Sequence, residues 1–357
     1  MSSALAAAQL VDTPARSSRQ RAALSFEPIK LLRAPAWDAA LKGSPQDSIF
    51  FQDSWLSAVR TATNWPVTPI VINQGPQILA GIIGIEPKVR RAERPAGPAK
   101  YEMIPLSPYA GPWVSDSLGD QSDVLAALAA HLPTRYARIQ LDLHPAWNDL
   151  RAFSRLGWRV EPRYTYVSSL SDTIEREASP AVRRRARRAA RASVEFDDSV
   201  PPDEFAALWS MTCTRRAIRE YVERDPLIKL LTRLIASDDC EILGARLPDG
   251  ALVAANAILY DQHAAYFWLS GFDADEPHRG ASNQLCHLET LRRAAQRVGR
   301  FDWLGANTPG IAEYKQSFGP RLVTYYRVSW DRQAASGPGW RQWLSDFPLL
   351  RRSRRCP

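Results

Sequence analysis

The sequence predicts an α/β protein built from two similar domains in tandem, each a mixed, twisted sheet flanked by helices. Segments with strand-like alternation and segments with helical periodicity follow one another along the chain, which is typical of mixed folds. The same order of elements occurs twice, and each copy ends on a helical segment stopped by glycine, in Phe153–Val160 and Lys315–Leu322. With 357 residues, the chain suits two domains of about 150 residues each. We expect a disordered leader at 1–25, domains at 26–170 and 171–331, and a basic tail at 332–357.

The elements of the first half follow from apolar periodicity and turn residues. Gly75-Pro76 lies between two alternating apolar segments, which predicts a β-hairpin. The expected elements are strand 26–32, helix 52–63, strands 67–73, 77–86 and 103–106, helix 120–131, strand 136–143, helix 147–156 and strand 158–170.

The second half repeats this order after two helices. Ser179 is placed to cap the first of these helices and Pro180 to begin it. The turn Pro248-Asp-Gly250 predicts another hairpin. The expected elements are helices 180–192 and 202–237, strands 240–247, 251–260 and 263–270, helix 282–298, strand 301–304, helix 308–318 and strand 322–330.

Composition and charge narrow the class of protein. The formal charge of +8 favours anionic partners such as phosphates, a nucleotide, RNA or an acidic membrane surface. The four cysteines lie far apart, which indicates neither a disulfide framework nor a metal site and suits a reducing cytoplasm. No apolar run reaches the roughly 20 residues that a membrane span needs. We therefore expect a cytoplasmic protein, for which peripheral contact with an anionic membrane is possible; nothing in the sequence indicates an oligomeric state.

The C-terminal third carries four short segments in a characteristic order: Tyr266–Gly271, His278–Leu285, Phe301–Gly305 and Glu313–Gly319. Together with Phe51–Leu56, they resemble the FemAB/CelD-like branch of the GNAT (N-acetyltransferase-like) acyltransferase superfamily, in which two such domains are fused. The resemblance extends over most of the chain. It implies an acyltransferase that binds no permanent cofactor and uses acyl-CoA as a co-substrate, with aminoacyl-tRNA as the alternative donor.

A donor site is expected where small residues open the helix after residue 278. Backbone N–H groups at such a helix start can approach a phosphate, and the helix N-terminus adds a partial positive charge. The resemblance implies that this loop holds the pyrophosphate of acyl-CoA, although the second glycine of the family's loop is missing; an ordinary helix cap is the alternative. Tyr266 and Trp268 share one face of the preceding strand and would line the cleft, unless they are core residues. The candidate donor-binding residues are Tyr266, Trp268, Arg279, Gly280, Ala281, Ser282 and Asn283.

The candidate catalytic residues are Lys315, Asp302 and Glu313. Because the sequence has no Ser-His-Asp pattern and no reactive cysteine, we expect direct attack by an acceptor amine, which needs proximity, an oxyanion donor and a proton acceptor. A fixed Lys315 ammonium would steady a carbonyl or phosphate oxygen, and the resemblance places this lysine against the donor; a surface lysine is the alternative. Asp302, Glu313 and His287 are the candidate proton acceptors.

An arginine-rich helix is expected near the start of the second domain, at 180–192. Its small residues form one narrow face, so most of its arginines point outward. Arg183, Arg184 and Arg187 are candidates for binding a phosphorylated acceptor, tRNA or lipid phosphates. A solvated helix surface is the alternative.

Together these features predict an acyltransferase that acylates an amino group of a cell-envelope or exopolysaccharide precursor, or of a small metabolite. Two alternatives remain at this point. One is aminoacyl transfer from charged tRNA to a peptidoglycan precursor, and the other is a non-catalytic GNAT-like protein that binds RNA or another anionic polymer.

Overall fold

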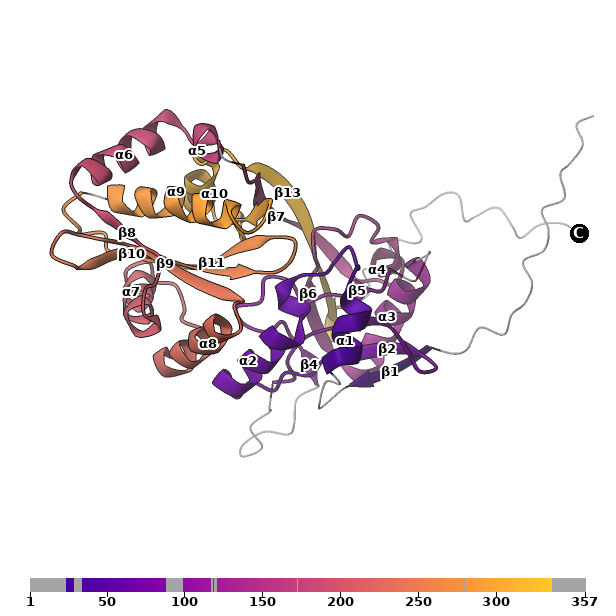
Figure 1. The fold of residues 1–357 in the computed structure, drawn as a ribbon. Coiled ribbons are helices and arrows are strands. Elements are labelled where there is room, and N and C mark those ends of the chain that lie inside the picture. Colours follow the sequence, from indigo (N-terminus) through magenta and orange to yellow (C-terminus); the bar gives the residue numbers. More distant parts are fainter. Residues whose placement is uncertain are drawn as a thin grey trace, which may run out of the picture.

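A computed structural model describes residues 24–28, 34–87, 99–116, 118, 121–171, 173–278 and 280–335. Most of the expected leader and tail, and Arg279, lie outside these residues. The predicted α/β class is confirmed: two twisted sheets are flanked by helices (Figure 1).

The strands form two sheets. The smaller sheet is antiparallel, in the order β1-β2-β3-β5, with β1 at Leu24–Pro28, β2 at Ile70–Gln74, β3 at Gln77–Ile82 and β5 at Trp113–Val114. The larger sheet has the order β4-β6-β13-β7-β12-β11-β10-β9-β8. Its strands are β4 (Lys100–Tyr101), β6 (Arg138–Asp142), β7 (Arg159–Ser169), β8 (Glu195–Asp197), β9 (Cys240–Arg246), β10 (Leu252–Tyr260), β11 (Ala265–Phe272), β12 (Arg300–Asp302) and β13 (Arg321–Asp331).

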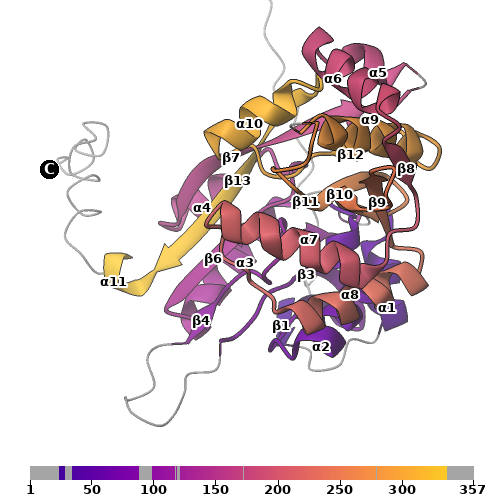
Figure 2. The ribbon, with the colours of Figure 1, turned by 90° about the vertical axis from the view of Figure 1, so that its left-hand side faces the viewer.

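The helices cover the two ends of the larger sheet. In the C-terminal half, α6 and α9 lie on one face of the sheet, and α7 and α8 lie on the other (Figures 1 and 2). The helices are α1 (Ala34–Leu41), η1 (Ile49–Phe51), α2 (Asp53–Thr63), α3 (Ser122–Arg135), α4 (Arg151–Arg155), α5 (Ile174–Glu177), α6 (Pro180–Arg191), α7 (Pro202–Arg215), α8 (Arg224–Ala236), α9 (Ala281–Ala295), α10 (Pro309–Gln316) and α11 (Arg332–Ala335).

The long helix expected at 202–237 is in fact two helices, α7 and α8. Ala217 ends α7 by adopting a left-handed conformation with φ of 50°. The N–H of Ile218 then donates to the carbonyl of Cys213 at 3.0 Å, which satisfies a carbonyl at the helix end. Because glycine is the usual residue at such a stop, an alanine gave no signal in the sequence.

The two halves exchange their last strands. β7, from the first half, pairs with β12 through Val167↔Asp302 and Ser169↔Arg300. β13, from the second half, pairs with β6 of the first half, where Arg327 is opposite Asp142 and the two form an ion pair of 2.5 Å. The β7 and β13 strands also pair with each other along most of their length. Each half is therefore closed by a strand that the other half supplies.

The halves also share a hydrophobic core. Aromatic ring pairs join the two halves, with centroids 5.1 Å apart for Phe50 and Tyr266 and 5.4 Å apart for Trp55 and Trp268.

Both glycines predicted to end helices adopt the left-handed conformation, with φ of 81° at Gly157 and 82° at Gly319. In the described part of the chain, no helix is long and apolar enough to cross a membrane.

Candidate active site

The site begins where two parallel strands separate. β11 pairs with β12 only through Ala265↔Phe301 and Tyr266↔Asp302, because β12 ends at Asp302 while β11 continues to Phe272. The space that opens is a cavity of about 810 Å³, which we call the C-half cavity. Its walls include the outer part of β11, the first two turns of α9, the chain after β12, and α10. Both Lys315 and Gly280 line it, as does Trp268.

Lys315 holds the turn that follows β12. Its Nζ donates to the carbonyl oxygens of Trp303 at 2.7 Å, of Leu304, and of Gly305 at 3.2 Å. Leu304 and Gly305 both have left-handed backbones, with φ of 48° and 54°, so their carbonyls turn toward the ammonium. Burial lowers the pKa of Lys315 to about 8, and the charge of Asp302 opposes this change. All three ammonium donors are occupied, so the lysine contributes a fixed positive charge and a shaped turn to the cavity wall.

Asp302 and Glu313 do not line this cavity. Asp302 is buried at the junction of the halves, where its carboxylate accepts hydrogen bonds from Tyr109 Oη at 2.8 Å, Thr165 Oγ1 at 2.6 Å and the Leu304 N–H at 2.9 Å. Burial raises its pKa, and these hydrogen bonds oppose the rise. Glu313 is exposed on α10. Neither carboxylate is therefore placed to take a proton within the cavity.

His287 is the proton-acceptor candidate that does line the cavity. Its Nδ1 lies 2.6 Å from the carbonyl oxygen of Asn283, so Nδ1 carries the proton and Nε2 is the unprotonated nitrogen. Burial lowers the pKa of His287 to about 4, so the imidazole is neutral at physiological pH. The ring lies against Trp303 and Phe318.

The loop before α9 differs from the phosphate cradle that we expected. The buried carboxylate of Glu276 accepts hydrogen bonds from the N–H of His278 at 2.7 Å, the N–H of Gly280 at 2.6 Å and Ser282 Oγ at 3.2 Å. Two backbone donors that were expected to meet a phosphate thus already bind an internal anion. Ser282 and Ala281 are buried and do not line the cavity. Glu276 was not predicted from the sequence. The one sequence signal for this residue is that an acid stands shortly before a helix start, which is a common capping arrangement.

Unlike Ala281 and Ser282, the next two residues of α9 have polar side chains that line the cavity. Asn283 and Gln284 both line it and are both buried. Asn283 Nδ2 donates to the Tyr314 hydroxyl at 2.9 Å, whereas Asn283 Oδ1 and Gln284 Oε1 have no partner among the described residues. A ligand with N–H or O–H donors would satisfy these two oxygens.

Of the two aromatic residues on β11 that were expected to line the cleft, one lines the cavity and the other does not. Trp268 lines the cavity, and its Nε1 donates to the carbonyl of Leu106 at 2.9 Å. Tyr266 does not line it; its hydroxyl donates to Asp261 Oδ2 at 2.8 Å, and its ring packs on the first half. Tyr266 therefore belongs to the contact between the halves.

The arginines expected to bind anions lie outside the cavity wall. Arg183, Arg184 and Arg187 are on α6 but do not line the cavity, whereas Arg185 of the same helix does. Three further arginines line it: Arg163 on β7, and Arg216 and Arg219 after α7. Among the described residues, the lining contains no aspartate or glutamate.

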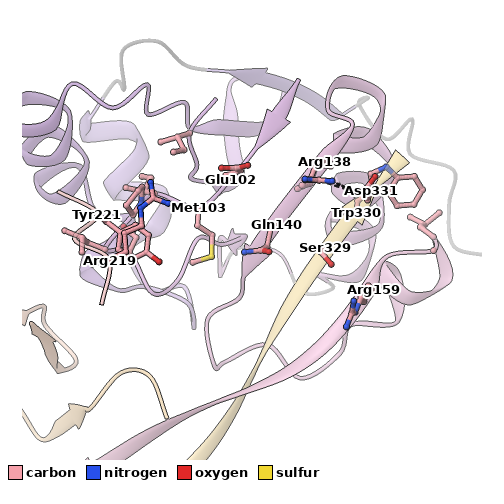
Figure 3. A pocket seen from close by; sticks show the side chains of 18 of the residues that line it. Glu102, Met103, Arg138, Gln140, Arg159, Arg219, Tyr221, Ser329, Trp330 and Asp331 are labelled. Atoms are coloured by element: carbon pink, nitrogen blue, oxygen red, sulfur yellow. Dashed lines mark hydrogen bonds and ion pairs between the residues drawn. The ribbon is translucent and has the colours of Figure 1, made fainter. Parts of the chain in front are cut away.

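A second, larger cavity of about 1450 Å³ lies in the first half, and we call it the N-half cavity. The chain after β4 and the start of β6 line it, and these two strands are a parallel pair, as β11 and β12 are beside the C-half cavity. Figure 3 shows Glu102, Met103 and Gln140 around it, with Arg138 paired to Asp331 at 2.8 Å. The two cavities adjoin, because Leu106, Ser107, Arg219 and Tyr221 line both.

Among the described residues, neither cavity has a group of side chains that could bind a metal ion. Over the described ranges, no three or more histidine, cysteine or acidic side chains are grouped so as to hold a metal ion.

Comparison with known proteins identifies the class. Residues 177–316 match the family model described as an acetyltransferase (GNAT) domain. The fold resembles the crystal structure of FemX, with a TM-score of 0.65 and 12% identity, covering 87% of this chain and 98% of that one. It also resembles the C-terminal domain of a provisionally named lysylphosphatidylglycerol synthetase from Agrobacterium fabrum, with a TM-score of 0.56, 15% identity and coverages of 84% and 92%. A tandem GNAT protein from the clavulanic acid biosynthesis pathway matches with a TM-score of 0.52, 12% identity and coverages of 88% and 99%.

Residues 177–316 thus match a GNAT domain, and the fold of the chain is similar to those of FemX and of a tandem GNAT protein, in agreement with the resemblance predicted from the sequence. A search of curated protein sequences finds no match.

Proposed function

We propose that this protein is an acyltransferase that moves an acyl group onto an amino group of an anionic acceptor by direct attack in the C-half cavity. The observation that carries this proposal is the opening beside β11 and β12. There the turn held by Lys315 faces a cavity that, in the described part of the chain, is lined by basic residues and by no acid. A GNAT domain that matches residues 177–316 supports the reaction class.

The chemistry can be assigned to groups around this opening. Beyond Tyr266, the edge of β11 has no strand partner on the β12 side, so its backbone N–H groups are available to a carbonyl oxygen that gains charge during attack. The fixed charge of Lys315 stabilises the same developing negative charge through the turn at Leu304 and Gly305. The amine nitrogen forms the new amide bond as the donor's thioester or ester bond breaks, and the thiol of coenzyme A or the hydroxyl of tRNA leaves. His287 lines the cavity and its Nε2 is unprotonated, so it accepts the proton that the amine loses and passes it to the leaving group.

Two substrates must meet in this reaction, and two adjoining cavities provide for them. The donor occupies the C-half cavity, and the acceptor enters from the N-half cavity across the residues that both share. The sequence favours acyl-CoA as the donor, with aminoacyl-tRNA as the alternative. Precursors of the cell envelope or of exopolysaccharide, or a small metabolite, are the proposed acceptors. FemX and the lysylphosphatidylglycerol synthetase domain share the fold of this chain, and they support a cell-envelope acceptor by analogy.

A transfer assay tests the proposal. Purified protein is incubated with radiolabelled acetyl-CoA, longer acyl-CoAs or aminoacyl-tRNA and a panel of amine acceptors, and labelled amide is counted. Wild type should form amide with one donor class, and Lys315→Met should lose most of the rate while Lys229→Met, on the exposed surface of α8, should keep it. Equal rates for both lysine variants would contradict the assignment of the site.

A further inference from the structure

Two arginines from different elements line the C-half cavity. Arg185 comes from α6 and Arg216 follows the end of α7, helices that lie on opposite faces of the sheet (Figure 1). Burial raises the pKa of the Tyr314 hydroxyl, and the charges of Arg216 and Arg185 both oppose that rise. Both guanidinium groups therefore lie within electrostatic reach of one hydroxyl at the cavity wall.

The position of Arg185 is fixed by its helix. α6 packs through Val182, Ala186 and Ala189, which are buried, and Ser179 caps it by accepting a hydrogen bond from the Val182 N–H at 3.3 Å. Arg188, one turn after Arg185, donates to the carbonyl of His278 in the loop before α9. This side of α6 is thus held beside the loop before α9, with Arg185 in the cavity wall.

The second arginine is also held in place. The guanidinium of Arg216 lies 5.2 Å from the centre of the Phe272 ring, at the end of β11. In the described part of the chain, neither Arg216 nor Arg185 has an acidic side chain within ion-pair distance. Because the cavity lining has no acid either, the charge of both arginines is free for a ligand.

The other anion-binding feature of this half is already occupied. The N–H groups of His278 and Gly280 and the hydroxyl of Ser282 bind the Glu276 carboxylate, so a phosphate at that loop would displace an internal ligand and meet a like charge. An anionic ligand of this cavity must therefore be held elsewhere.

We infer that Arg185 and Arg216 form an anion subsite that takes the phosphate or pyrophosphate group of a substrate, in place of the loop before α9. Planar guanidinium groups can each bind two phosphate oxygens, which suits a pyrophosphate held between two arginines. The reactive end of the same ligand then extends inward toward Lys315. The inference rests on the proposed function in that it takes the C-half cavity as the substrate site.

Binding measurements test it without turnover. Inorganic pyrophosphate, coenzyme A and UDP-N-acetylglucosamine are titrated by calorimetry into wild type and into Arg185→Ala, Arg216→Ala, Arg184→Ala and Arg187→Ala. The last two variants lose the same charge from α6 at positions that do not line the cavity. At least one probe should bind wild type, and Arg185→Ala and Arg216→Ala should each weaken it about tenfold or more and flatten its salt dependence, since each removes a charge-assisted hydrogen bond. The control variants should stay within about twofold, as expected for exposed charges.

The affinities for coenzyme A and for UDP-N-acetylglucosamine show whether the subsite binds the phosphate of the donor or of the acceptor. Tight binding of coenzyme A assigns the subsite to the donor, and tight binding of the UDP-sugar assigns it to the acceptor. Arg185→Lys, which keeps the charge, should recover part of the affinity and guards against a misfolded alanine variant.

Three results would overturn the inference: no probe binds wild type, Arg184→Ala or Arg187→Ala weakens binding as much as Arg185→Ala, or Glu276→Gln weakens binding more than Arg185→Ala and Arg216→Ala do. Binding that depends on both arginines in a protein that transfers no acyl group would leave the subsite intact and contradict only the proposed reaction.

Discussion

Lys315 Nζ lies 2.7 Å from the carbonyl oxygen of Trp303, and this hydrogen bond ties α10 to the end of β12. The same ammonium also binds the carbonyls of Leu304 and Gly305. A buried cation thus shapes the turn where the two parallel strands separate. The predictions below test this turn, the junction beside it and the cavity it faces.

Replacing Lys315 with methionine should destabilise the fold as well as stop transfer. The change removes hydrogen bonds from a charged donor and leaves three carbonyls at a left-handed turn without that partner, at a cost of about 1.5–3 kcal/mol. Urea denaturation measures the loss. Lys229→Met is the matched control and should lie within about 0.5 kcal/mol of wild type, because it is an exposed position.

Asp302→Asn should be destabilising, whereas Glu313→Gln should not. An amide at position 302 puts an NH₂ group where a carboxylate oxygen now accepts a hydrogen bond, from Tyr109, Thr165 or the Leu304 N–H. We expect a loss of about 1–3 kcal/mol in the free energy of unfolding. The change at exposed Glu313 should stay within about 0.5 kcal/mol. Equal stabilities of the two variants would contradict the structural role assigned to Asp302.

His287 should make the protein less stable in mild acid. Its pKa is about 4 in the folded protein, below the ordinary value of 6.5, so between these two pH values the unfolded chain binds more protons than the folded one. The free energy of unfolding should therefore fall as the pH is lowered from 6.5 to 4, by up to about 3 kcal/mol from this residue. His287→Phe removes this contribution, so the free energy of unfolding should fall less steeply with decreasing pH in the variant than in wild type. Parallel pH profiles would show that the imidazole is not buried in its neutral form.

The strand exchange predicts how fragments behave. A fragment of residues 171–331 lacks β7, which lies between β12 and β13 in the sheet, so it should not unfold cooperatively by circular dichroism. Co-expression with residues 24–170 should restore a folded complex. A cooperatively folded 171–331 fragment would show that the exchanged strands are dispensable.

Local features of the sequence predicted much of the fold. Apolar alternation around turn residues predicted the hairpins, and Gly157 and Gly319 were predicted as helix stops because glycine tolerates the left-handed conformation. The exchange of β7 and β13 could not be predicted, since strand pairing depends on distant contacts and both strands have the same local pattern. The end of α7 was missed because Ala217, rather than glycine, adopts the left-handed conformation there.

The site was predicted less completely. Lys315, Gly280, Asn283 and Trp268 were named from the sequence, and the structure brings them to one cavity. The sequence also pointed to the arginine-rich helix, but Arg185 rather than Arg183, Arg184 or Arg187 reaches the cavity. The helix period fixes which residues face the core, but it does not say which flank of the helix lies beside a cavity formed by distant segments.

Blocking the cavity tests the central claim most directly, namely that acyl transfer takes place in the C-half cavity. Ser270 on β11 lines this cavity, so Ser270→Trp would fill it; Ser57→Trp, on the exposed surface of α2, adds the same side chain outside both cavities. The measurement is the rate of labelled amide formation by each variant relative to wild type, with melting temperatures recorded to confirm folding. We predict that Ser270→Trp loses nearly all transfer while Ser57→Trp keeps the wild-type rate. Full activity in a folded Ser270→Trp variant would contradict the claim.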